Sequence, residues 1–454
     1  MCDSGGAEAK KWGSLMRTSR PPLLLILFGG AFVVGMTAGA LNADDMALPP
    51  CSFIVRPAGA PATCGLPFPP EALRPVGMNS MGEWVGYRYL CDDPTVKIAL
   101  RWSAEAGLQA MPLPPGSWNS FAAGINDRGT IVGFREGTTN GIKHGQWACI
   151  WMGGQFIEIP PADNCSAWSG ANAVNNADVV VGWRDGPSCK GGSPSRYAFI
   201  WQAGQVTDID PIPFGTSSAQ AIGVSENGIV AGYIGGATLG SGRAFRWTNG
   251  VMEILQPLPG GLNSTAFGVN DSGTVVGRTY TPASPDELLR LVPTIWRVGS
   301  GPESLALLPG YRSGACIRVN NANTVLGWMS QPQQAGLAHN PYVLWIDGVP
   351  HALGDLVGIP AAIESTTGID LNDRGTALCV GGDTLISPPG GAWLMSPTSA
   401  AADLNGDCRI DGADLSLLLG NWGLANANAQ GDLNHDGRVD GVDLGLLLGS
   451  WSVG

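Results

Sequence analysis

Gly268-Val-Asn-Asp-Ser-Gly-Thr-Val-Val-Gly277 places a polar turn between an apolar pair and a β-branched pair. Asn tolerates a left-handed backbone and bonds to its own main chain, and Gly readily takes a positive φ, so Asn270 and Gly273 are typical of a tight hairpin. The β-branched residues that follow favour a strand. The stretch therefore predicts two antiparallel strands joined at Asn270.

The same pattern recurs seven times between residues 77 and 379, at intervals of 45 to 52 residues. A second motif, best seen in Ala244-Phe-Arg-Trp247, alternates with it and ends in Trp. Seven interleaved copies of both motifs indicate a repeat protein. The Asn270 position is occupied by Asn79, Asn126, Asn175, Ser225, Asn270, Asn320 and Asn372, and the second motif ends at Trp102, Trp151, Trp201, Trp247, Trp296, Trp345 and Trp393.

Each unit supplies four short strands: the two that flank the Asn turn, the Trp strand, and a further run such as Val251–Leu255. Four antiparallel strands in about 50 residues match the size of a β-propeller blade. We therefore predict a mainly β fold, a seven-unit β-propeller of four-stranded antiparallel blades, over residues 44–395. A stacked β-solenoid or an array of two-sheet sandwiches is the alternative.

The ends of the repeat region predict how the ring closes. The last unit breaks off after Trp393-Leu-Met395, so its fourth strand is missing, whereas Ser52–Arg56 reads as a strand without a unit of its own. Pairing residues 52–56 with residues 391–395 would remove two exposed sheet edges.

The units resemble the HAF repeat, whose pattern runs A-F-x-W-x-x-G…G-x-N-x-x-G-x-V-V-G. The resemblance covers residues 77–395 and is closest in Ala244–Gly277. It implies export and a repetitive β fold, and it implies no activity and no catalytic residues.

The composition and the N-terminal segment bear on location. The chain of 454 residues has a net charge of −12, which argues against a nucleic-acid partner. Basic residues precede an uncharged run over 21–43 that ends in small residues, the pattern of a secretory signal peptide. We predict a signal peptide over 1–43 and a secreted or cell-surface protein, with an uncleaved membrane anchor as the alternative.

Cysteine usage is compatible with an oxidising compartment. Cys51–Cys64 and Cys165–Cys189 are the closest pairs that could form disulfides, and buried free thiols are the equal alternative. The body of the chain contains Cys51, Cys64, Cys91, Cys149, Cys165, Cys189, Cys316 and Cys379.

The composition changes after a linker over 396–402. Residues 403–454 carry eight Asp and two Arg, a net charge of −6, in two Asp-rich loops that are each followed by a Leu-rich run. Oxygen ligands at loop positions 1, 3, 5, 9 and 12, with a carbonyl at position 7, suit Ca²⁺. The predicted ligands of two calcium ions are Asp403, Asn405, Asp407, Arg409 (carbonyl), Asp411 and Asp414 in the first loop, and Asp432, Asn434, Asp436, Arg438 (carbonyl), Asp440 and Asp443 in the second.

This tail resembles a type I dockerin, a small α-helical domain with two F-hand loops, over 403–451. The resemblance implies a cohesin as the partner, but Gly412-Ala413 and Gly441-Val442 stand where polar contact residues are usual, so another surface protein is an equal alternative. Cys408 stands at position 6, where the second loop has Gly437, so we expect the first site to be the weaker. We expect a small core of Leu415, Leu418, Leu419, Trp422, Leu444, Leu447, Leu448 and Trp451.

Two functions follow from these features. The first is a secreted, non-enzymatic recognition or scaffold protein whose propeller binds a glycan or a protein and whose tail docks it to a complex or cell surface. The second is a carbohydrate-active enzyme of a polysaccharide-degrading system, tethered by the tail, which would need two carboxylates across a cleft. No carboxylate lies in a catalytic motif; the candidates are Glu83, Asp92, Asp93, Glu136, Glu226, Glu303 and Glu364, and the candidate ligand-face aromatics are Trp118, Trp168, Trp183 and Trp328.

Overall fold

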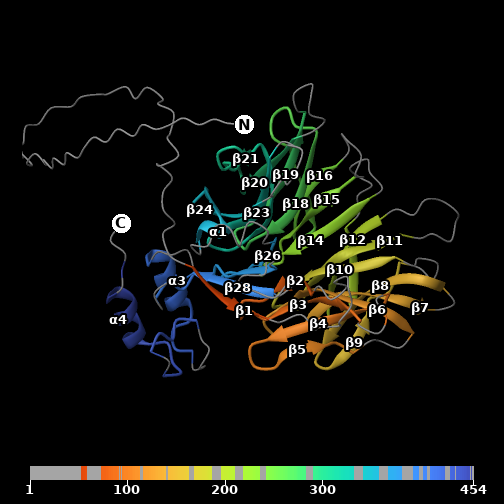
Figure 1. Cartoon of the computed structure of the whole chain (residues 1–454), viewed down its shortest axis with the longest axis horizontal. Helices are drawn as coiled ribbons and strands as arrows, with labels where there is room; N and C mark the ends of the chain where they lie inside the picture. The colour runs from red at the N-terminus through yellow and green to blue at the C-terminus, as the bar shows by residue number, and fades with distance from the viewer. Residues whose placement is uncertain are drawn as a thin grey trace, which may run out of the picture. The chain divides into compact units, whose positions relative to one another are not determined.

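A computed structural model gives the fold of the chain (Figure 1). Residues 1–43, where the signal peptide is predicted, and Cys51, Cys64, Cys91, Cys165 and Cys189 lie outside the residues that it describes. The described residues are 53–58, 73–90, 93, 95–112, 116–139, 142–162, 168–186, 196–209, 218–235, 242–282, 290–331, 341–356, 367–380, 392–397, 402–405, 410–424, 430–434, 436–449 and 451.

The repeat region forms a seven-bladed β-propeller of four-stranded antiparallel sheets, as predicted. In each of the first six blades the strands pair in chain order. Blades 1 to 3 consist of β2 (Arg74–Met78), β3 (Trp84–Tyr89), β4 (Lys97–Ser103) and β5 (Gly107–Ala110); β6 (Ser117–Ile125), β7 (Ile131–Thr139), β8 (Ile142–Met152) and β9 (Gln155–Glu158); and β10 (Ser169–Val174), β11 (Val180–Asp185), β12 (Arg196–Gln202) and β13 (Gln205–Ile209).

Blades 4 to 6 repeat this order, and a short helix, α1 (Leu353–Leu356), follows the last of them. Their strands are β14 (Ala219–Val224), β15 (Val230–Ile234), β16 (Arg243–Thr248) and β17 (Val251–Leu255); β18 (Asn263–Val269), β19 (Val275–Thr281), β20 (Arg290–Trp296) and β21 (Pro302–Ser304); and β22 (Ser313–Val319), β23 (Val325–Ser330), β24 (Tyr342–Ile346) and β25 (Val349–Ala352).

Blade 7 closes the ring with a strand from the other end of the chain. It contains β26 (Thr367–Leu371), β27 (Ala377–Val380) and β28 (Ala392–Pro397), and β1 (Phe53–Pro57) pairs with β28 as the fourth strand. Val55 lies opposite Met395 in the antiparallel register. The predicted closure is thereby confirmed, and it pairs the outer edge of the last blade.

A β-bulge in the first strand of every blade explains the Gly that ends the repeated motif. In blade 5 the register shifts between Ala266 and Gly268, and Gly277 lies opposite the bulge. A Cβ on Gly277 would lie 1.9 Å from the carbonyl oxygen of Thr265, so no side chain fits there. The same shift occurs in the other six blades, opposite Gly86, Gly133, Gly182, Gly232, Gly327 and, in blade 7, Cys379.

The hydrophobic core lies in the spaces between successive blades. One buried cluster joins Ile150 of blade 2 to Phe199 and Trp201 of blade 3. Of the repeated Trp residues, those at 151, 201, 296, 345 and 393 are buried, and Trp102 and Trp247 are half-buried. These residues therefore fill the space between blades and do not form a ligand face.

Three cysteines lie within the described residues, and all are buried free thiols: Cys149, Cys316 and Cys379. Burial raises the pKa of Cys149 and Cys316 and raises that of Cys379 to about 12. These thiols are therefore core side chains and not nucleophiles. Among the described helices, none is long and apolar enough to cross a membrane.

The tail contains two nine-residue helices, α3 (Gly412–Gly420) and α4 (Gly441–Gly449), and each follows one Asp-rich segment. Asp411 caps α3 by accepting a hydrogen bond from Ala413 N, and Asp414 completes a capping box. The two halves share a small core of Ala402, Leu404, Ile410, Leu418, Val439 and Leu447.

Candidate functional site

The repeated Asn of each turn fastens its own blade to the next one. The Oδ1 atom of Asn126 accepts hydrogen bonds from Arg128 N and Thr130 N, which holds the turn. Its Nδ2 donates to the carbonyl oxygen of Asn175 in blade 3, at 2.9 Å. The same bond runs from Asn79, Asn175, Asn270, Asn320 and Asn372 to the carbonyl oxygens of Asn126, Ser225, Asn320, Asn372 and Asn79.

These Asn side chains and their hydrogen bonds form a ring around the propeller, here called the amide ring. The ring has one gap, where blade 4 carries Ser225 in place of Asn. Ser225 Oγ still accepts a hydrogen bond from Ile229 N, at 3.2 Å. The side chain is too short, however, to donate across the boundary between blades 4 and 5; such a boundary between successive blades is here called a seam. Asn227 Nδ2 donates instead to the carbonyl oxygen of Asp271, at 3.0 Å. The seam between blades 4 and 5 is therefore fastened by a neighbouring side chain.

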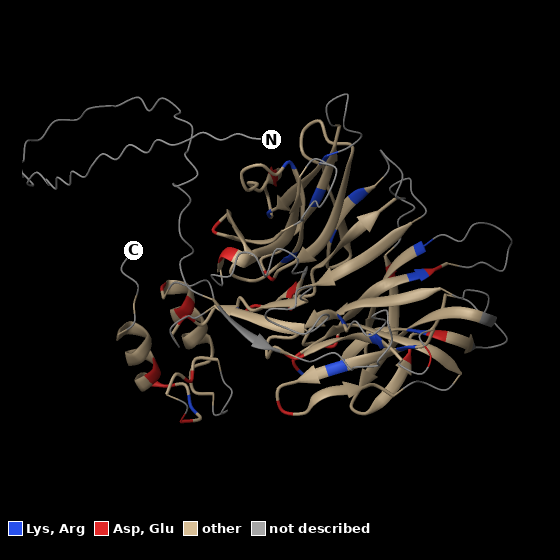
Figure 2. Ribbon diagram, in the orientation of Figure 1, with Lys and Arg blue, Asp and Glu red and all other residues tan. Residues whose placement is uncertain are grey.

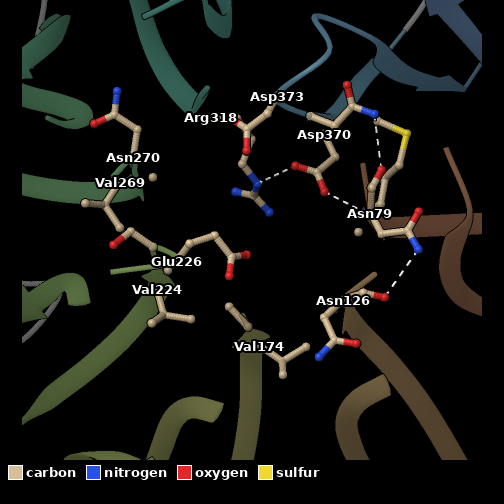
Figure 3. Close-up of a pocket in the computed structure, with 18 of the residues that line it drawn as sticks. Asn79, Asn126, Val174, Val224, Glu226, Val269, Asn270, Arg318, Asp370 and Asp373 are labelled. Atoms are coloured by element: carbon tan, nitrogen blue, oxygen red, sulfur yellow. Dashed lines mark hydrogen bonds and ion pairs between the residues drawn. The ribbon is translucent and has the colours of Figure 1, made fainter. Parts of the chain in front are cut away.

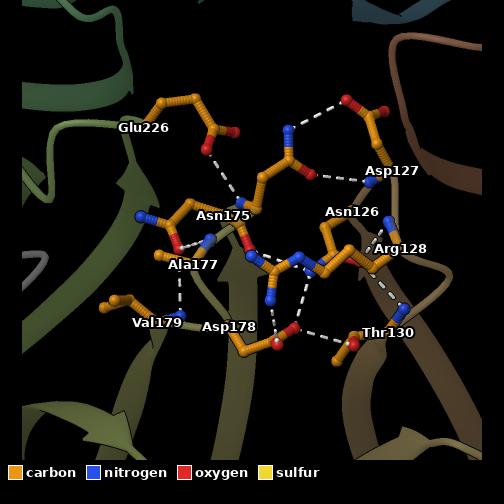
Figure 4. Close-up of polar contacts among 10 residues, drawn as sticks. Asn126, Asp127, Arg128, Thr130, Asn175, Ala177, Asp178, Val179 and Glu226 are labelled. Atoms are coloured by element: carbon orange, nitrogen blue, oxygen red, sulfur yellow. Dashed lines mark hydrogen bonds and ion pairs between the residues drawn. The ribbon is translucent and has the colours of Figure 1, made fainter. Parts of the chain in front are cut away.

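Figure 4 shows a seam in which the turn Gly is replaced by an acid. Asp178 adopts a positive φ of 56° and accepts hydrogen bonds from Asn126 Nδ2 and Thr130 Oγ1, each at 2.8 Å, and from Arg128 Nη1 at 3.1 Å. Asp tolerates the left-handed region better than most residues. The cost of this backbone is offset by three contacts to blade 2.

The residue after each repeated Asn forms a second ring, which the sequence analysis did not identify. The Oδ1 atom of Asp127 accepts a hydrogen bond from Ser80 N at 2.8 Å, and Glu226 Oε2 accepts one from Asn176 N at 2.8 Å. The recurrence of a carboxylate or amide directly after the Asn was the available signal. The ring consists of Ser80, Asp127, Asn176, Glu226, Asp271, Asn321 and Asp373.

These rings border a cavity of about 230 Å³ that is lined by residues from all seven blades (Figure 3). Five blades present a small residue to it two positions before the repeated Asn, but blades 6 and 7 present Arg318 and Asp370. Arg318 Nε donates to Asp370 Oδ1 at 2.7 Å, and Met78 N donates to Asp370 Oδ2 at 2.8 Å. This ion pair joins blades 6, 7 and 1.

The ring makes two of its carboxylates less acidic. Loss of water contact raises the pKa of Glu226 against the opposing hydrogen bond from Asn176 N, and the charges of Asp271, Asp127 and Asp373 raise it further. Loss of water contact likewise raises the pKa of Asp373. Glu226 was a candidate acid in the sequence, and it lies here beside three carboxylates that were not.

The other candidate acids are not brought together. Glu83 pairs with Arg101 at 2.8 Å, Glu136 accepts a hydrogen bond from Asn119 Nδ2 at 2.6 Å, and Glu303 pairs with Arg297, each within its own blade. Asp93 is bonded to Thr95 Oγ1 at 2.6 Å, and Asp92 and Glu364 lie outside the described residues. Figure 2 shows how sparsely charged residues are spread over the blades.

The four off-repeat aromatics differ in exposure. Trp168 is 50% exposed. The guanidinium of Arg196 lies over Trp183, 3.8 Å from its ring centre. The ring centres of Trp118 and His144 are 5.2 Å apart. Trp328 is half-buried in β23. Trp118 and Trp183 are half-buried as well, so Trp168 is the most exposed of the four.

The two Asp-rich segments of the tail fold alike around the last Asp of each loop. Asp414 Oδ1 accepts hydrogen bonds from Leu404 N and Asn405 N, at 2.7 and 3.2 Å. Asp443 Oδ1 accepts them from Leu433 N and Asn434 N, at the same distances. Both carboxylates are fully buried and tie the start of the loop to the helix.

The remaining predicted calcium ligands do not converge on one point in either loop. Asp432 is buried and accepts hydrogen bonds from Asp436 N and Gly437 N, whereas Asn434 and Asp436 are exposed. Asp403 is buried, Asn405, Asp411 and Asp440 are half-buried, Arg438 is exposed, and Asp407 and Arg409 lie outside the described residues. Within the described part of the tail, no three acidic, His or Cys side chains are close enough to hold a metal ion.

Burial alone would raise the pKa of Asp443, but hydrogen bonds from the backbone of Asp440, Asn434 and Leu433 outweigh it and hold that pKa below its ordinary value. The carboxylate is therefore ionised at neutral pH. An ionised acid at loop position 12 is what a hard cation requires.

The expected apolar core of the tail is only half formed. Leu418 and Leu447 are buried and Leu415 and Leu444 half-buried, as predicted. The prediction was wrong for Leu419, Trp422, Leu448 and Trp451, which are 50%, 46%, 50% and 37% exposed. Two helices of nine residues bury only the narrow face that contains Asp414 and Leu418 in one and Asp443 and Leu447 in the other.

Comparison with known proteins adds little. No family model and no curated protein matches the sequence. Among solved structures, an acylaminoacyl peptidase from Pyrococcus horikoshii is similar over 72% of this chain and 52% of its own, at 10% identity and a TM-score of 0.42. The chain thus spans about half the length of that relative.

Proposed function

We propose that this is a secreted, non-enzymatic recognition or scaffold protein, in which the propeller is a rigid binding module and the tail docks it to a complex or a cell surface in a calcium-dependent manner. The observation that carries the proposal is the exposed pair of Leu and Trp that follows the same Asp-rich pattern in both halves of the tail. Large apolar side chains left in solvent indicate a surface that a partner covers.

The chemistry of the predicted ligands in the tail supports the binding of calcium. Every predicted side-chain ligand is an oxygen donor, and Asp414 and Asp443 are held by the same backbone contacts in the two halves. Asn434 and Asp436 are exposed and hydrogen-bond to each other and to the backbone of the loop, contacts that would be exchanged for the ion when the loop tightens on it. Because the eight Asp repel one another without a cation, binding and folding of the tail should be coupled.

The propeller supports the recognition role through its rigidity. At six of the seven boundaries between blades, an Asn side-chain amide donates a hydrogen bond of 2.9–3.3 Å to the backbone of the next blade, and β1 closes the ring. A scaffold fixed in this way loses little freedom when a ligand binds its loops. Trp168 is the aromatic most accessible to a glycan or protein ligand.

Docking is tested by attachment of the full chain to the cell-envelope fraction of its producing cells, in Ca²⁺ or in EGTA. We expect retention in Ca²⁺, loss in EGTA, and at least a tenfold loss in the double variant Trp422→Ala/Trp451→Ala. Val251→Ala removes a side chain that is 70% exposed in blade 4 and is the matched control. Equal retention of the parent in Ca²⁺ and in EGTA, together with unchanged retention of the double variant, would contradict docking through the tail.

The alternative, a carbohydrate-active enzyme, is favoured by one observation: Glu226 has a raised pKa and lies in a cavity with four further carboxylates. The full chain should therefore be incubated with a panel of polysaccharides. We expect no release of new reducing ends. Release that disappears in Glu226→Gln would make the protein an enzyme.

A further inference from the structure

The residue after the Gly that lies opposite the β-bulge has the same place in successive blades. It is on the second strand of the blade, beyond the bulge as counted from the Asn turn, and so lies toward the end of the propeller opposite to the Asn turns. On β11, β15 and β19 of blades 3, 4 and 5 it is Trp183, Tyr233 and Arg278 (Figure 1). All three side chains are half-buried, so each keeps an accessible part.

Arg196 connects blade 3 to blade 4 at this end. Its guanidinium lies over the ring of Trp183, 3.8 Å from the ring centre. Its backbone forms an isolated bridge with Ser218, directly before β14, and β14 pairs with the strand that contains Tyr233. Burial raises the pKa of Tyr233, and the positive charges of Arg196 and Arg278 oppose that rise. The phenol of Tyr233 is therefore close to both guanidinium groups.

Arg278 is held by aromatic rings and by no acid. Its guanidinium carbon lies 5.1 Å from the ring centre of Phe267 and 5.0 Å from that of Tyr280. Its Nε atom is buried, and none of the described residues accepts a hydrogen bond from it. Contacts with ring faces orient a guanidinium without using its N–H donors. The charge of Arg278 is thus fixed in place and has no counter-ion among the described residues.

This part of the propeller is basic, although the chain has a net charge of −12 and the carboxylates of the second ring lie at the Asn turns. Arg196 Nε is paired with Asp185 at 2.9 Å. Arg243, beside it in blade 4, donates to the carbonyl oxygens of Gly242 and Leu262 and to no described acid. A partly buried cation without a counter-ion loses hydration, which an anion from outside would offset. We name the following set the aromatic–arginine strip: Trp183, Arg196, Tyr233, Arg278 and Tyr280.

We propose that the aromatic–arginine strip is a ligand face of the propeller and that its ligand is an acidic polysaccharide that contains uronic acid residues. This inference rests on the recognition role proposed above. The C–H face of a pyranose ring packs on the accessible parts of Trp183 and Tyr233. The uronate carboxylate accepts charge-assisted hydrogen bonds from the guanidinium of Arg278, whose planar fork fits a carboxylate.

The charge of the strip favours such a glycan over a nucleic acid. A nucleic acid carries a phosphate at every residue and is bound by a groove of cations that follows its backbone. Across blades 3 to 5 the strip has one paired guanidinium, on Arg196, and one unpaired guanidinium, on Arg278. Carboxylates spaced along a chain of sugar rings match this low density of positive charge.

The test is calorimetric titration of the full chain with a galacturonic acid hexamer in EGTA, where calcium bridges and the calcium-dependent tail take no part. We expect saturable binding that is at least about tenfold weaker in Arg278→Gln and partly restored in Arg278→Lys, which keeps the charge without the fork. The methyl-esterified hexamer has the same rings without the charge. It should also bind the parent at least about tenfold more weakly.

Arg184→Gln is the matched control. It removes one positive charge beside Trp183, but Asp208 already neutralises Arg184 through contacts of 2.7 and 2.8 Å. The affinity for the hexamer should therefore change by less than about twofold. Thermal unfolding of each variant checks that the propeller remains folded, and the esterified hexamer tests the role of charge on the parent itself.

Three results would overturn the proposal: no binding of the hexamer, equal binding of the hexamer and its methyl ester, or tighter binding of oligo-dT than of the hexamer. An affinity that Arg278→Gln leaves unchanged would do the same. Docking through the tail would stand in each case, because it is measured in Ca²⁺ by retention on the cell envelope and by the variants at Trp422 and Trp451.

Discussion

At the residue scale, one Asn in each of six blades both shapes a turn and joins two blades. The first role could be predicted, because an Asn before a Gly is a local turn signal. The second could not, because the acceptor of Asn126 Nδ2 is the carbonyl of Asn175, 49 residues away. The second ring, which contains Asp127 and Glu226, was not predicted for the same reason. In the sequence these two are ordinary turn residues, and only the placement of the blades side by side brings them into one ring.

The gap in the amide ring gives a prediction at this scale. Ser225→Asn should supply the missing donor to the carbonyl of Asn270 and raise the free energy of unfolding by about 0.5–1.5 kcal/mol. The reverse change at the next blade, Asn270→Ser, should lower it by about 1–3 kcal/mol, because it removes the hydrogen bonds from Asn270 Nδ2 to the carbonyl oxygen of Asn320 and to Asn323 Oδ1. Denaturant unfolding of both variants measures this; equal effects of the same sign would refute the amide-ring account.

At the scale of the element, the strands were easier to predict than the faces of the short helices. Period and turn chemistry located the four strands of each blade. Leu419 and Trp422 read as core because they continue an apolar run, but α3 ends at Gly420 and packs only its Leu418 face. A helix of nine residues is too short for its apolar pattern alone to decide which side is covered.

The second loop of the tail yields a prediction about its sixth position. Gly437 has a φ of 89°, and a Cβ there would meet open space, so only backbone strain opposes a side chain. Gly437→Ala should weaken the second calcium site about tenfold, since a left-handed non-Gly residue costs about 1–2 kcal/mol.

The converse change, Cys408→Gly, should strengthen the first site by a similar factor. Calorimetric titration of both variants with Ca²⁺ is the measurement, and Gly445→Ala, at an open helical position, is the control. Unchanged affinity in Gly437→Ala would mean that position 6 does not limit binding.

At the scale of the whole molecule, the ring could be predicted because seven copies of one unit leave one strand missing at one end and one unpaired at the other. The pairing of β1 with β28 satisfies both ends. What the sequence could not give is the interior of the ring: Arg318 and Asp370 are 52 residues apart, and only closure brings Asp370 to the backbone of Met78.

Closure gives the prediction for this scale. Phe53 is buried against blades 6 and 7, so Phe53→Ala should lower the free energy of unfolding of the whole propeller by about 3–5 kcal/mol. The loss should appear in one cooperative transition, followed by tryptophan fluorescence. Val298→Ala, at a side chain that is 64% exposed, is the control. A loss confined to a minor early transition would mean that β1 does not close the ring.

The central claim, that a calcium-loaded tail docks a rigid propeller, is tested most directly by calorimetric titration of the full chain with Ca²⁺. The account predicts two ions per chain, the tighter one lost in Asp432→Ala, and no change in Glu105→Ala, which removes an exposed carboxylate from a blade turn. A chain that takes up no Ca²⁺, or that binds the same number of ions when Asp432 is replaced, would contradict it.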